Sequence, residues 1–217
     1  MTNPLIRFFT KNTAEYWDKA YRAELATGKI RADKNLSKTL FLFHKAKSIL
    51  DFGAGAGGNV KFLASQFSDR SFCLVDHSTT SLAYARDKLL GDSDSKGNRF
   101  EFHTSLDSLK TRSFDLVMSI EVIEHVKNYK DTLDSLWSLV SPGGMLLISV
   151  PVKGWRDRNR EHVNKFTIKQ IFELLRSYSD WVHVSARTFS KRSGVLSTAY
   201  FYIEKPLESP TAGQRFL

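Results

Sequence analysis

The chain has 217 residues, of which 41% are hydrophobic and 25% are charged. This length and composition predict one globular domain with a substantial core. No run of 18 apolar residues occurs, which excludes a membrane-spanning helix. The first residues contain neither a continuous apolar segment nor a small-residue cleavage site, so we expect no signal peptide and a cytoplasmic protein. The single cysteine, Cys73, lies in the apolar stretch SFCLV and is interpreted as a buried structural thiol.

The formal net charge of +9 is unevenly distributed along the chain. Residues 151–192 contain ten Lys or Arg against four Asp or Glu, a local excess of six positive charges. Such a region is either a solvated face or a surface that attracts phosphate groups, whether of a nucleotide-linked sugar or of RNA. Few aromatic residues lie between these charges, which disfavours a stacking platform for single-stranded nucleic acid.

The N-terminal 47 residues are predicted to be helical, because Leu36, Leu40 and Phe43 recur at helical spacing and no strand pattern precedes them. Short apolar runs then alternate with amphipathic stretches. Strands are predicted at 47–52, 71–76, 99–103, 114–120 and 144–150, and helices at 59–67, 80–90 and 129–140. This alternation predicts βαβ units, a parallel sheet and right-handed crossovers.

The last third of the chain follows a different pattern. A helix is predicted at 167–178 with Thr167 as its N-terminal cap, and Pro142 to Gly144 are expected to end the preceding helix. Two β-rich runs at 181–189 and 197–204, joined by the polar turn SKRSG, predict an antiparallel hairpin that completes the sheet. The polar cluster at 91–98 is interpreted as a surface loop.

A glycine-rich loop follows the first predicted strand. Gly53, Gly55 and Gly58 satisfy the spacing G-x-G-x-x-G between a strand and a helix, which permits a tight turn and a close approach of a ligand. The second strand ends in Asp76, eighteen residues past Gly58, where a carboxylate can hold ribose hydroxyls. Together these features predict a cofactor that contains a nucleoside.

Asp51 distinguishes between two kinds of nucleoside cofactor. It stands two residues before the first glycine of the loop. A carboxylate there suits a ligand with an ammonium and a sulfonium group better than one with two phosphates. The alternative interpretation is a hydrogen bond from backbone N–H groups to Asp51 that orders the loop.

Four motifs, ILDFGAGAGGN, LVDHS, SFDLVMSIEVIEHV and SPGGMLLISVP, together resemble the nucleotide-binding half of class I S-adenosylmethionine-dependent methyltransferases. The resemblance implies an α/β three-layer sandwich with a Rossmann-like, seven-stranded, mostly parallel sheet of order 3-2-1-4-5-7-6, in which strand 7 is antiparallel. It also implies a helical cap at 1–47, a core at 48–205 with an acceptor-lid insertion at about 151–166, and a flexible tail at 206–217.

The resemblance assigns the cofactor contacts residue by residue. It implies that Gly53 and Gly55 face the methionine part of S-adenosylmethionine and that Asp76 binds the ribose. The other contacts that it implies are Asp51, His77, Ser105, Leu106 and Ile120. Tyr16 and Trp17 lie where an N-terminal helix often covers the cofactor in this family, and packing in the core is the equally good alternative for both.

Three ionisable residues follow the fourth strand in the stretch IEVIEHV. Glu121, Glu124 and His125 stand at positions i, i+3 and i+4, which share one face of a helix. They lie just past the carboxyl end of the strand, the edge where open α/β sheets bind ligands. His162 is eleven residues past the fifth strand and is expected to approach the same place. Two carboxylates and two imidazoles form a candidate divalent-metal site.

The pattern Glu-x-x-Glu-His with a later histidine resembles the metal site of two methyltransferase groups: the ubiquinone-pathway O-methyltransferases and the 2′-O-methyltransferases of small RNAs. It implies Glu121, Glu124, His125 and His162 as ligands of an ion that activates a hydroxyl. The sequence VNKFT after His162 departs from the RNA group. Metal-free relatives share E-V-I-E-H, and in them the histidine acts as a general base. Purely structural roles for these residues are the third alternative.

The sequence therefore predicts an S-adenosylmethionine-dependent methyltransferase that acts on an oxygen or nitrogen of a small molecule, such as a sugar, a polyol or an anionic metabolite. Lys153, Arg156, Arg158 and Arg160 are expected to form part of the acceptor lid. Three alternatives remain: a metal-dependent RNA 2′-O-methyltransferase, a nicotinamide-dependent oxidoreductase, and a module that binds the cofactor without chemistry.

Overall fold

The computed structural model describes residues 12–27, 30, 32–91, 96–189 and 196–207. The described residues therefore leave out residues 1–11 of the predicted cap and residues 208–217 of the predicted tail. The predicted SKRSG turn lies wholly outside them. Within the part described, no helix has the length and apolar character that crossing a membrane requires. The division into cap, core, lid and tail stays a prediction.

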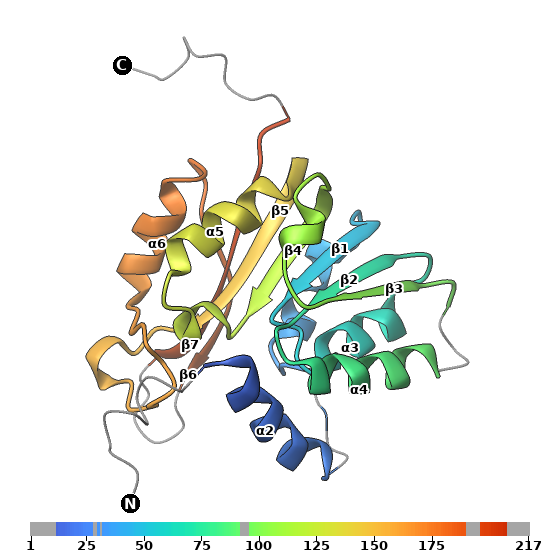
Figure 1. The fold of residues 1–217 in the computed structure, drawn as a ribbon. Coiled ribbons are helices and arrows are strands. Elements are labelled where there is room, and N and C mark those ends of the chain that lie inside the picture. The colour runs from blue at the N-terminus through green and yellow to red at the C-terminus, as the bar shows by residue number, and fades with distance from the viewer. Residues whose placement is uncertain (1–11, 28–29, 31, 92–95, 190–195, 208–217) are drawn as a thin grey trace, which may run out of the picture.

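A seven-stranded sheet forms the centre of the molecule, with the order β3-β2-β1-β4-β5-β7-β6 (Figure 1). The predicted order is confirmed, and β7 pairs antiparallel with both β5 and β6. The strands are β1 Ser48–Phe52, β2 Ser71–Val75, β3 Arg99–His103, β4 Phe114–Ile120, β5 Val140–Pro151, β6 His183–Phe189 and β7 Leu196–Glu204.

Helices cover both faces of the sheet, as Figure 1 shows. The α-helices are α2 Ala14–Leu25, α3 Gly58–Gln66, α4 Thr79–Leu90, α5 Tyr129–Ser138 and α6 Ile168–Arg176. The short 3₁₀ helices are η1 Leu36–Phe43, η2 Asp107–Leu109, η3 Ile123–His125 and η4 Gly154–Arg156. Thr167 caps α6 as predicted, in a capping box that it forms with Gln170.

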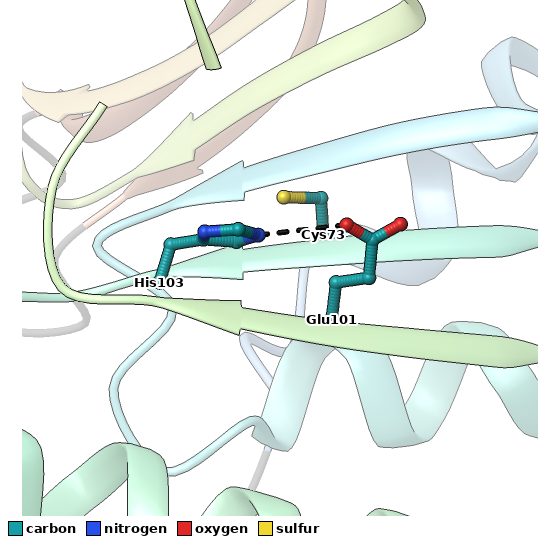
Figure 2. Close-up of side chains that lie close together, drawn as sticks. All are labelled: Cys73, Glu101 and His103. Atoms are coloured by element: carbon teal, nitrogen blue, oxygen red, sulfur yellow. Dashed lines mark hydrogen bonds and ion pairs between the residues drawn. The ribbon is translucent and has the colours of Figure 1, made fainter. Parts of the chain in front are cut away.

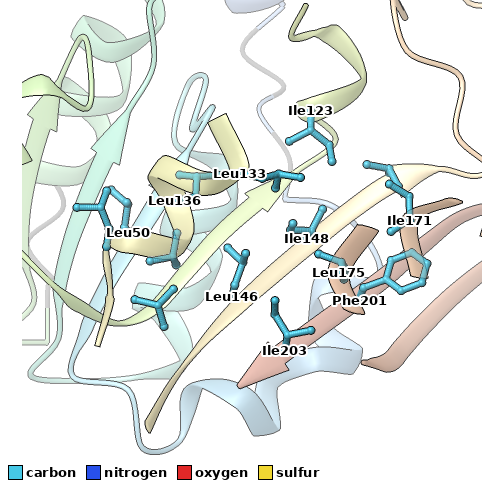
Figure 3. Close-up of a cluster of buried hydrophobic side chains, with 14 of the residues drawn as sticks. Leu50, Ile123, Leu133, Leu136, Leu146, Ile148, Ile171, Leu175, Phe201 and Ile203 are labelled. Carbon is cyan, nitrogen blue, oxygen red and sulfur yellow. The ribbon is translucent and has the colours of Figure 1, made fainter. Parts of the chain in front are cut away.

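The alternation of side chains along the strands divides the core into two apolar clusters. One cluster packs the sheet against α5 and α6, where Leu133, Leu136, Ile171 and Leu175 are almost fully buried (Figure 3). The other packs the opposite face against α3, α4 and η1. Because this two-sided packing buries the strands, β4 and β5 are apolar along nearly their whole length.

Two local predictions differ from the structure. The segment around Leu36 is a 3₁₀ helix rather than an α-helix, and it is separate from α2. The fifth strand begins at Val140, four residues before the predicted start, because Val140 already pairs with Phe114. Pro142 to Gly144 therefore lie within the strand at a register irregularity, and the helix before it ends at Ser138.

Candidate functional site

A cavity of about 630 Å³ is lined by residues that follow the carboxyl ends of the central strands. Phe52, Val75 and Thr104 lie at the ends of β1, β2 and β3, and Glu121 lies at the end of β4. Strand ends converge at one edge of a parallel sheet, and the loops after them leave a crevice there. The cavity therefore occupies the place where this fold binds its ligands.

The glycine loop borders this cavity with a left-handed backbone that suits glycine. Gly53, Gly55 and Gly57 all have positive φ, between 52° and 77°. A Cβ atom on Gly53 would lie 2.3 Å from Cγ2 of Val122, and one on Gly55 would lie 2.5 Å from the hydroxyl oxygen of Tyr21. The third left-handed glycine is Gly57, which immediately precedes α3, rather than the motif glycine one residue later.

Asp76 is held beside this loop by two backbone donors. The N–H of Gly55 donates to Oδ2 at 2.8 Å, and the N–H of Ser78 donates to Oδ1 at 2.8 Å. The side chain is 6% exposed and lines the cavity. Each carboxylate oxygen keeps a second lone pair, so the residue is positioned to accept hydrogen bonds from vicinal hydroxyls.

The other predicted cofactor residues divide into two sets. Gly53, His77 and Ser105 line the cavity together with Asp76. Asp51, Gly55, Leu106 and Ile120 lie outside its lining. Ile120 belongs to the apolar core, and Leu106 packs against the core from the other face.

Asp51 is a buried carboxyl group that lacks a hydrogen-bond partner. It is 1% exposed, and neither of its oxygens is bonded to another group. The alternative of a loop-ordering hydrogen bond to backbone N–H groups is therefore wrong. Burial, and secondarily the charge of Asp76, raise the pKa of Asp51 to about 8. Near neutral pH the raised pKa favours the uncharged carboxyl group, so the predicted electrostatic role of Asp51 toward a cationic ligand stays a prediction.

The stretch after β4 does not form the continuous helix that the spacing predicts. Glu121 has a φ of 57°, and η3 follows as a single short turn. Oε1 of Glu121 accepts a hydrogen bond from Oγ of Ser149 at 3.1 Å. Burial raises the pKa of Glu121 to about 7. Its carboxylate is not among the ligand atoms that Glu124, His125 and His162 bring together.

Glu124, His125 and His162 come together as predicted. One candidate ligand atom of each lies within 4.8 Å of the others, and Glu121 is outside this group. Glu124 is 1% exposed, and its carboxylate oxygens have no hydrogen-bond partner. Burial, and then the charge of Glu121, hold the pKa of Glu124 well above its usual value. The structure thus brings together three of the four candidate metal ligands and leaves out Glu121.

His125 lines the cavity, and its two ring nitrogens have different surroundings. Its Nδ1 lies 3.1 Å from the backbone oxygen of Glu161, so Nδ1 carries the proton and Nε2 is the acceptor. Nε2 lies 4.0 Å from Oε1 of Glu124. The ring contacts Trp17 edge to face, with ring centroids 5.2 Å apart. Burial lowers the pKa of His125, which favours the neutral imidazole.

The residue types of Glu124, His125 and His162 suit a divalent ion. Both histidines use Nδ1 for an oxygen partner, the arrangement that orients metal-binding imidazoles. Nε2 of His162, however, already lies 2.9 Å from Nδ2 of Asn159. An ion would have to displace this amide, so the set fits a metal only after a local rearrangement.

A second cluster of possible ligands lies on the outer strands, where Cys73, Glu101 and His103 meet (Figure 2). Its groups already have partners: Glu101 accepts from the Arg112 guanidinium at 2.6 and 3.2 Å, and His103 contacts Ser108 at 2.9 Å. Burial raises the pKa of the Cys73 thiol to about 12. These contacts favour a structural role, which agrees with the interpretation of Cys73 as a buried thiol.

Helix α2 connects the two sides of the cavity. Asp18 accepts hydrogen bonds from Oγ of Ser78 at 2.5 Å and from the N–H of Thr80 at 3.1 Å, on the side of Asp76. On the other side, the Tyr16 hydroxyl donates to Oε1 of Glu161. Trp17 lines the cavity, so the structure favours the covering role for it over packing in the core.

Sequence reasoning missed several residues of the cavity. The apolar ones are Tyr21, Phe52, Val75, Val122, Val126 and Val163, and the polar ones are Asn12, Thr104 and Lys127. Phe52, Val75 and Thr104 each stand directly before or after a predicted strand end, a signal that could have identified them. No local signal marks Val163, which reaches the cavity only through the path of the chain after β5.

Residues 50–146 match the family described as "Methyltransferase domain". Among curated proteins, the chain is 27% identical over 129 residues to phosphoethanolamine N-methyltransferase 2 of Caenorhabditis elegans, covering 58% of this chain and 29% of that protein. It is 34% identical over 104 residues to the mitochondrial ubiquinone biosynthesis O-methyltransferase of Schizosaccharomyces pombe, covering 48% of this chain and 37% of that protein. The chain thus spans well under half the length of these relatives.

Residues 50–146 therefore match a methyltransferase domain, and the sheet has the strand order that the resemblance to class I S-adenosylmethionine-dependent methyltransferases implies. Solved structures agree in fold. A Haemonchus contortus phosphoethanolamine N-methyltransferase 2 bound to phosphomonomethylethanolamine and S-adenosylhomocysteine superposes with a TM-score of 0.64 at 18% identity, over 88% of this chain and 58% of that one. The [4+2]-cyclase SpnF gives a TM-score of 0.70 at 14% identity, over 91% and 98%. The methyltransferase fold is therefore shared with an enzyme named for a different reaction.

Proposed function

We propose that this methyltransferase domain transfers the methyl group of S-adenosylmethionine to an oxygen or nitrogen of a small-molecule acceptor. The observation that supports the proposal most strongly is that residues predicted to bind the cofactor and the candidate general base line the same cavity. Gly53 and Asp76 line it, and so does His125, whose Nδ1 is occupied by the backbone oxygen of Glu161 and whose Nε2 is left as the acceptor. The substrates of the relatives, which include phosphoethanolamine and trans-aconitate by name, are small molecules as well.

The chemistry of this arrangement is methyl transfer with removal of a proton from the acceptor. The acceptor atom attacks the methyl carbon as the bond from carbon to sulfur breaks, and its electron pair stays on sulfur. Nε2 of His125 takes the acceptor proton, because Nδ1 is anchored on the backbone oxygen of Glu161. Trp17 packs against the imidazole and limits its rotation. The protein thus contributes mainly position and proton removal.

Glu124, His125 and His162 also support a metal-assisted variant of the same reaction. An ion held there would lower the pKa of a bound hydroxyl. Its presence is tested by comparing methyl transfer by the protein after chelator treatment with transfer after Mg²⁺ or Zn²⁺ is returned. Loss and recovery of transfer support the metal, and equal transfer in both samples contradicts it.

Lys127 at the cavity, together with exposed basic residues on the segment after β5, supports an acceptor with an anionic group. Lys127 is exposed and lines the cavity, and Lys153, Arg158 and Arg160 are exposed on the segment after β5. One structural neighbour was solved with a phosphate-bearing amine. An anionic group at the mouth would leave the hydroxyl or amine of the acceptor directed toward His125.

The experiment measures transfer of the radiolabelled methyl group of S-adenosylmethionine to a panel that contains phosphoethanolamine, trans-aconitate, a catechol and a short RNA. Transfer to an anionic small molecule, with a Michaelis constant raised at least about tenfold by Lys127→Glu and Arg158→Glu, supports the proposal. Lys88→Glu on α4 is the matched control. Transfer to RNA with a steep salt dependence would select the RNA alternative instead. Tight NAD binding without a response to S-adenosylhomocysteine would select the oxidoreductase.

A further inference from the structure

The segment Asp157–Asn164, here called the strap, carries the contacts that orient both histidines. The backbone oxygen of Glu161 accepts from His125, and His162 belongs to the strap itself. Asn164 fastens the strap to η3, since its Nδ2 lies 3.0 Å from the oxygen of Ile123 and 2.7 Å from that of Val126. The positions of the two imidazoles are therefore fixed by one short piece of chain.

The hydrogen bonds within the strap determine where His162 carries its proton. The N–H of Glu161 donates to Oδ1 of Asn159 at 3.0 Å, so the other side-chain atom of Asn159 is its amide nitrogen. That nitrogen lies 2.9 Å from Nε2 of His162 and must be the donor, which makes Nε2 the acceptor. Nδ1 of His162 therefore carries the proton and donates to Oδ2 of Asp157 at 2.6 Å.

Asp157 completes this network and is itself held in place. Its Oδ1 accepts from the N–H of Asn159 at 3.0 Å, and its side chain is about 5% exposed. The hydrogen bond from His162 favours the ionised carboxylate and helps to hold the pKa of Asp157 below its usual range. A buried carboxylate that accepts from Nδ1 is the arrangement that fixes an imidazole tautomer in hydrolytic triads. The His162 ring lies against the His125 ring, with centroids 4.8 Å apart.

We propose that Asp157 is a positioning residue of the active site, which holds His162 in the tautomer with an unprotonated Nε2 beside His125, and that Asn159 caps this nitrogen until a ligand displaces the amide. Neither residue belongs to the candidate base or ligand set. The role of the network in turnover depends on the proposed methyl transfer, whereas the tautomer that it sets does not.

His162 can act as a general base or as a ligand of a cation, and both roles require an unprotonated Nε2. An unprotonated Nε2 accepts a proton from the acceptor or donates its lone pair to a cation, and a protonated Nε2 does neither. Removing the negative charge at Asp157 leaves Nδ1 without its charge-assisted partner. The ring is then free to populate the other tautomer, in which Nε2 carries the proton and Nδ1 is bare.

The direct test is ¹⁵N NMR of the histidine ring nitrogens at one fixed pH, in the whole protein and in Asp157→Asn, Asp157→Glu and Asn159→Ala. We expect the wild type and Asn159→Ala to show Nδ1–H with a bare Nε2 at His162. Asp157→Asn is expected to show a mixture of tautomers and Asp157→Glu a partial return. Methyl transfer to an acceptor of the panel is expected to fall at least tenfold in Asp157→Asn and to persist in Asn159→Ala.

The outcomes separate this inference from the proposed function. An unchanged tautomer in Asp157→Asn overturns the inference, and so does a changed tautomer with unchanged turnover. Equal losses of turnover and melting temperature in Asp157→Asn and Asn159→Ala would show a purely structural strap and would also overturn it. Failure of S-adenosylhomocysteine to bind overturns the proposed function, and in that case the tautomer measurement still decides what Asp157 does to His162.

Discussion

The two sides of the cavity are built in different ways. On the cofactor side, the glycine loop and Asp76 come from consecutive β-α connections, and the carboxylate is held by the N–H groups of Gly55 and Ser78. On the acceptor side, His125 is held by Glu161 from the strap and packed by Trp17 from α2. The cofactor side is thus made largely of backbone within one supersecondary unit, and the acceptor side is assembled from remote segments.

This difference implies different sensitivities to mutation. A backbone-built site fails when its φ angles or close contacts are disturbed, because no side chain can compensate. A site built from side chains loses only the role of the side chain that is mutated, because each side chain can be removed while the scaffold stays folded. Substitutions on the cofactor side should therefore affect stability and binding together, and substitutions on the acceptor side should affect turnover alone.

The largest effect is expected for Gly53→Ala. The added methyl group would lie 2.3 Å from Cγ2 of Val122 at a φ of 76°, so both a clash and backbone strain arise. We expect a loss of about 1–3 kcal/mol in the free energy of unfolding, and loss of detectable S-adenosylhomocysteine binding in calorimetry. Gly58→Ala at the start of α3 is the control, because its φ is not left-handed. Equal stability and equal S-adenosylhomocysteine binding in the two variants would contradict the view that the cofactor side depends on its backbone conformation.

The next largest effect is expected for His125→Asn, which keeps a donor for the oxygen of Glu161 and removes Nε2, the proposed proton acceptor. Turnover should fall by about 10²–10⁴-fold, while the dissociation constant of S-adenosylhomocysteine stays within twofold of wild type. His183→Asn, on β6 and against Tyr202, is the matched control. A parallel loss of cofactor affinity in His125→Asn would remove the distinction between the two sides.

How far each side could be predicted follows from the same difference. The strand and helix periods predicted the βαβ units and a parallel sheet, and the glycine spacing with Asp76 predicted the cofactor edge, because these signals are local. The strand order itself was implied by the resemblance to class I methyltransferases and not by the periods. The contacts of the acceptor side join distant residues: Tyr16 and Glu161 are 145 positions apart. The turn at Glu121, which separates it from Glu124, arises from a left-handed φ that an i, i+3, i+4 pattern does not reveal.

A smaller effect is expected from Asp51, through the dependence of stability on pH. Its pKa of about 8 in the folded state lies above the ordinary aspartate pKa of 3.8, so between these values the folded state binds a proton that the unfolded state does not. The free energy of unfolding should therefore fall as pH rises from about 4 to about 8. Asp51→Asn should flatten this slope and raise stability at pH 8 by on the order of 2 kcal/mol. Urea titrations at pH 5 and pH 8 measure it, and identical slopes in both proteins would contradict the assignment.

The smallest effect is expected for Thr167→Ala, far from either side of the cavity. The substitution removes one half of the capping box at the start of α6 and should lower the free energy of unfolding by about 1 kcal/mol. Thr132→Ala in α5, whose hydroxyl bonds only a carbonyl within its own helix, is the control and should be neutral within about 0.5 kcal/mol. Chemical denaturation distinguishes them, and a change in methyl transfer by Thr167→Ala would argue against its purely structural role.

The most direct test of the central claim is calorimetric titration of S-adenosylhomocysteine into the wild-type protein, with NAD as the comparison ligand. A cavity lined by the left-handed Gly53 and by Asp76 predicts saturable heat with one site per chain and a micromolar dissociation constant, about −8 kcal/mol. NAD should give no heat in the same range. Heat from NAD with none from S-adenosylhomocysteine would contradict the account of this cavity.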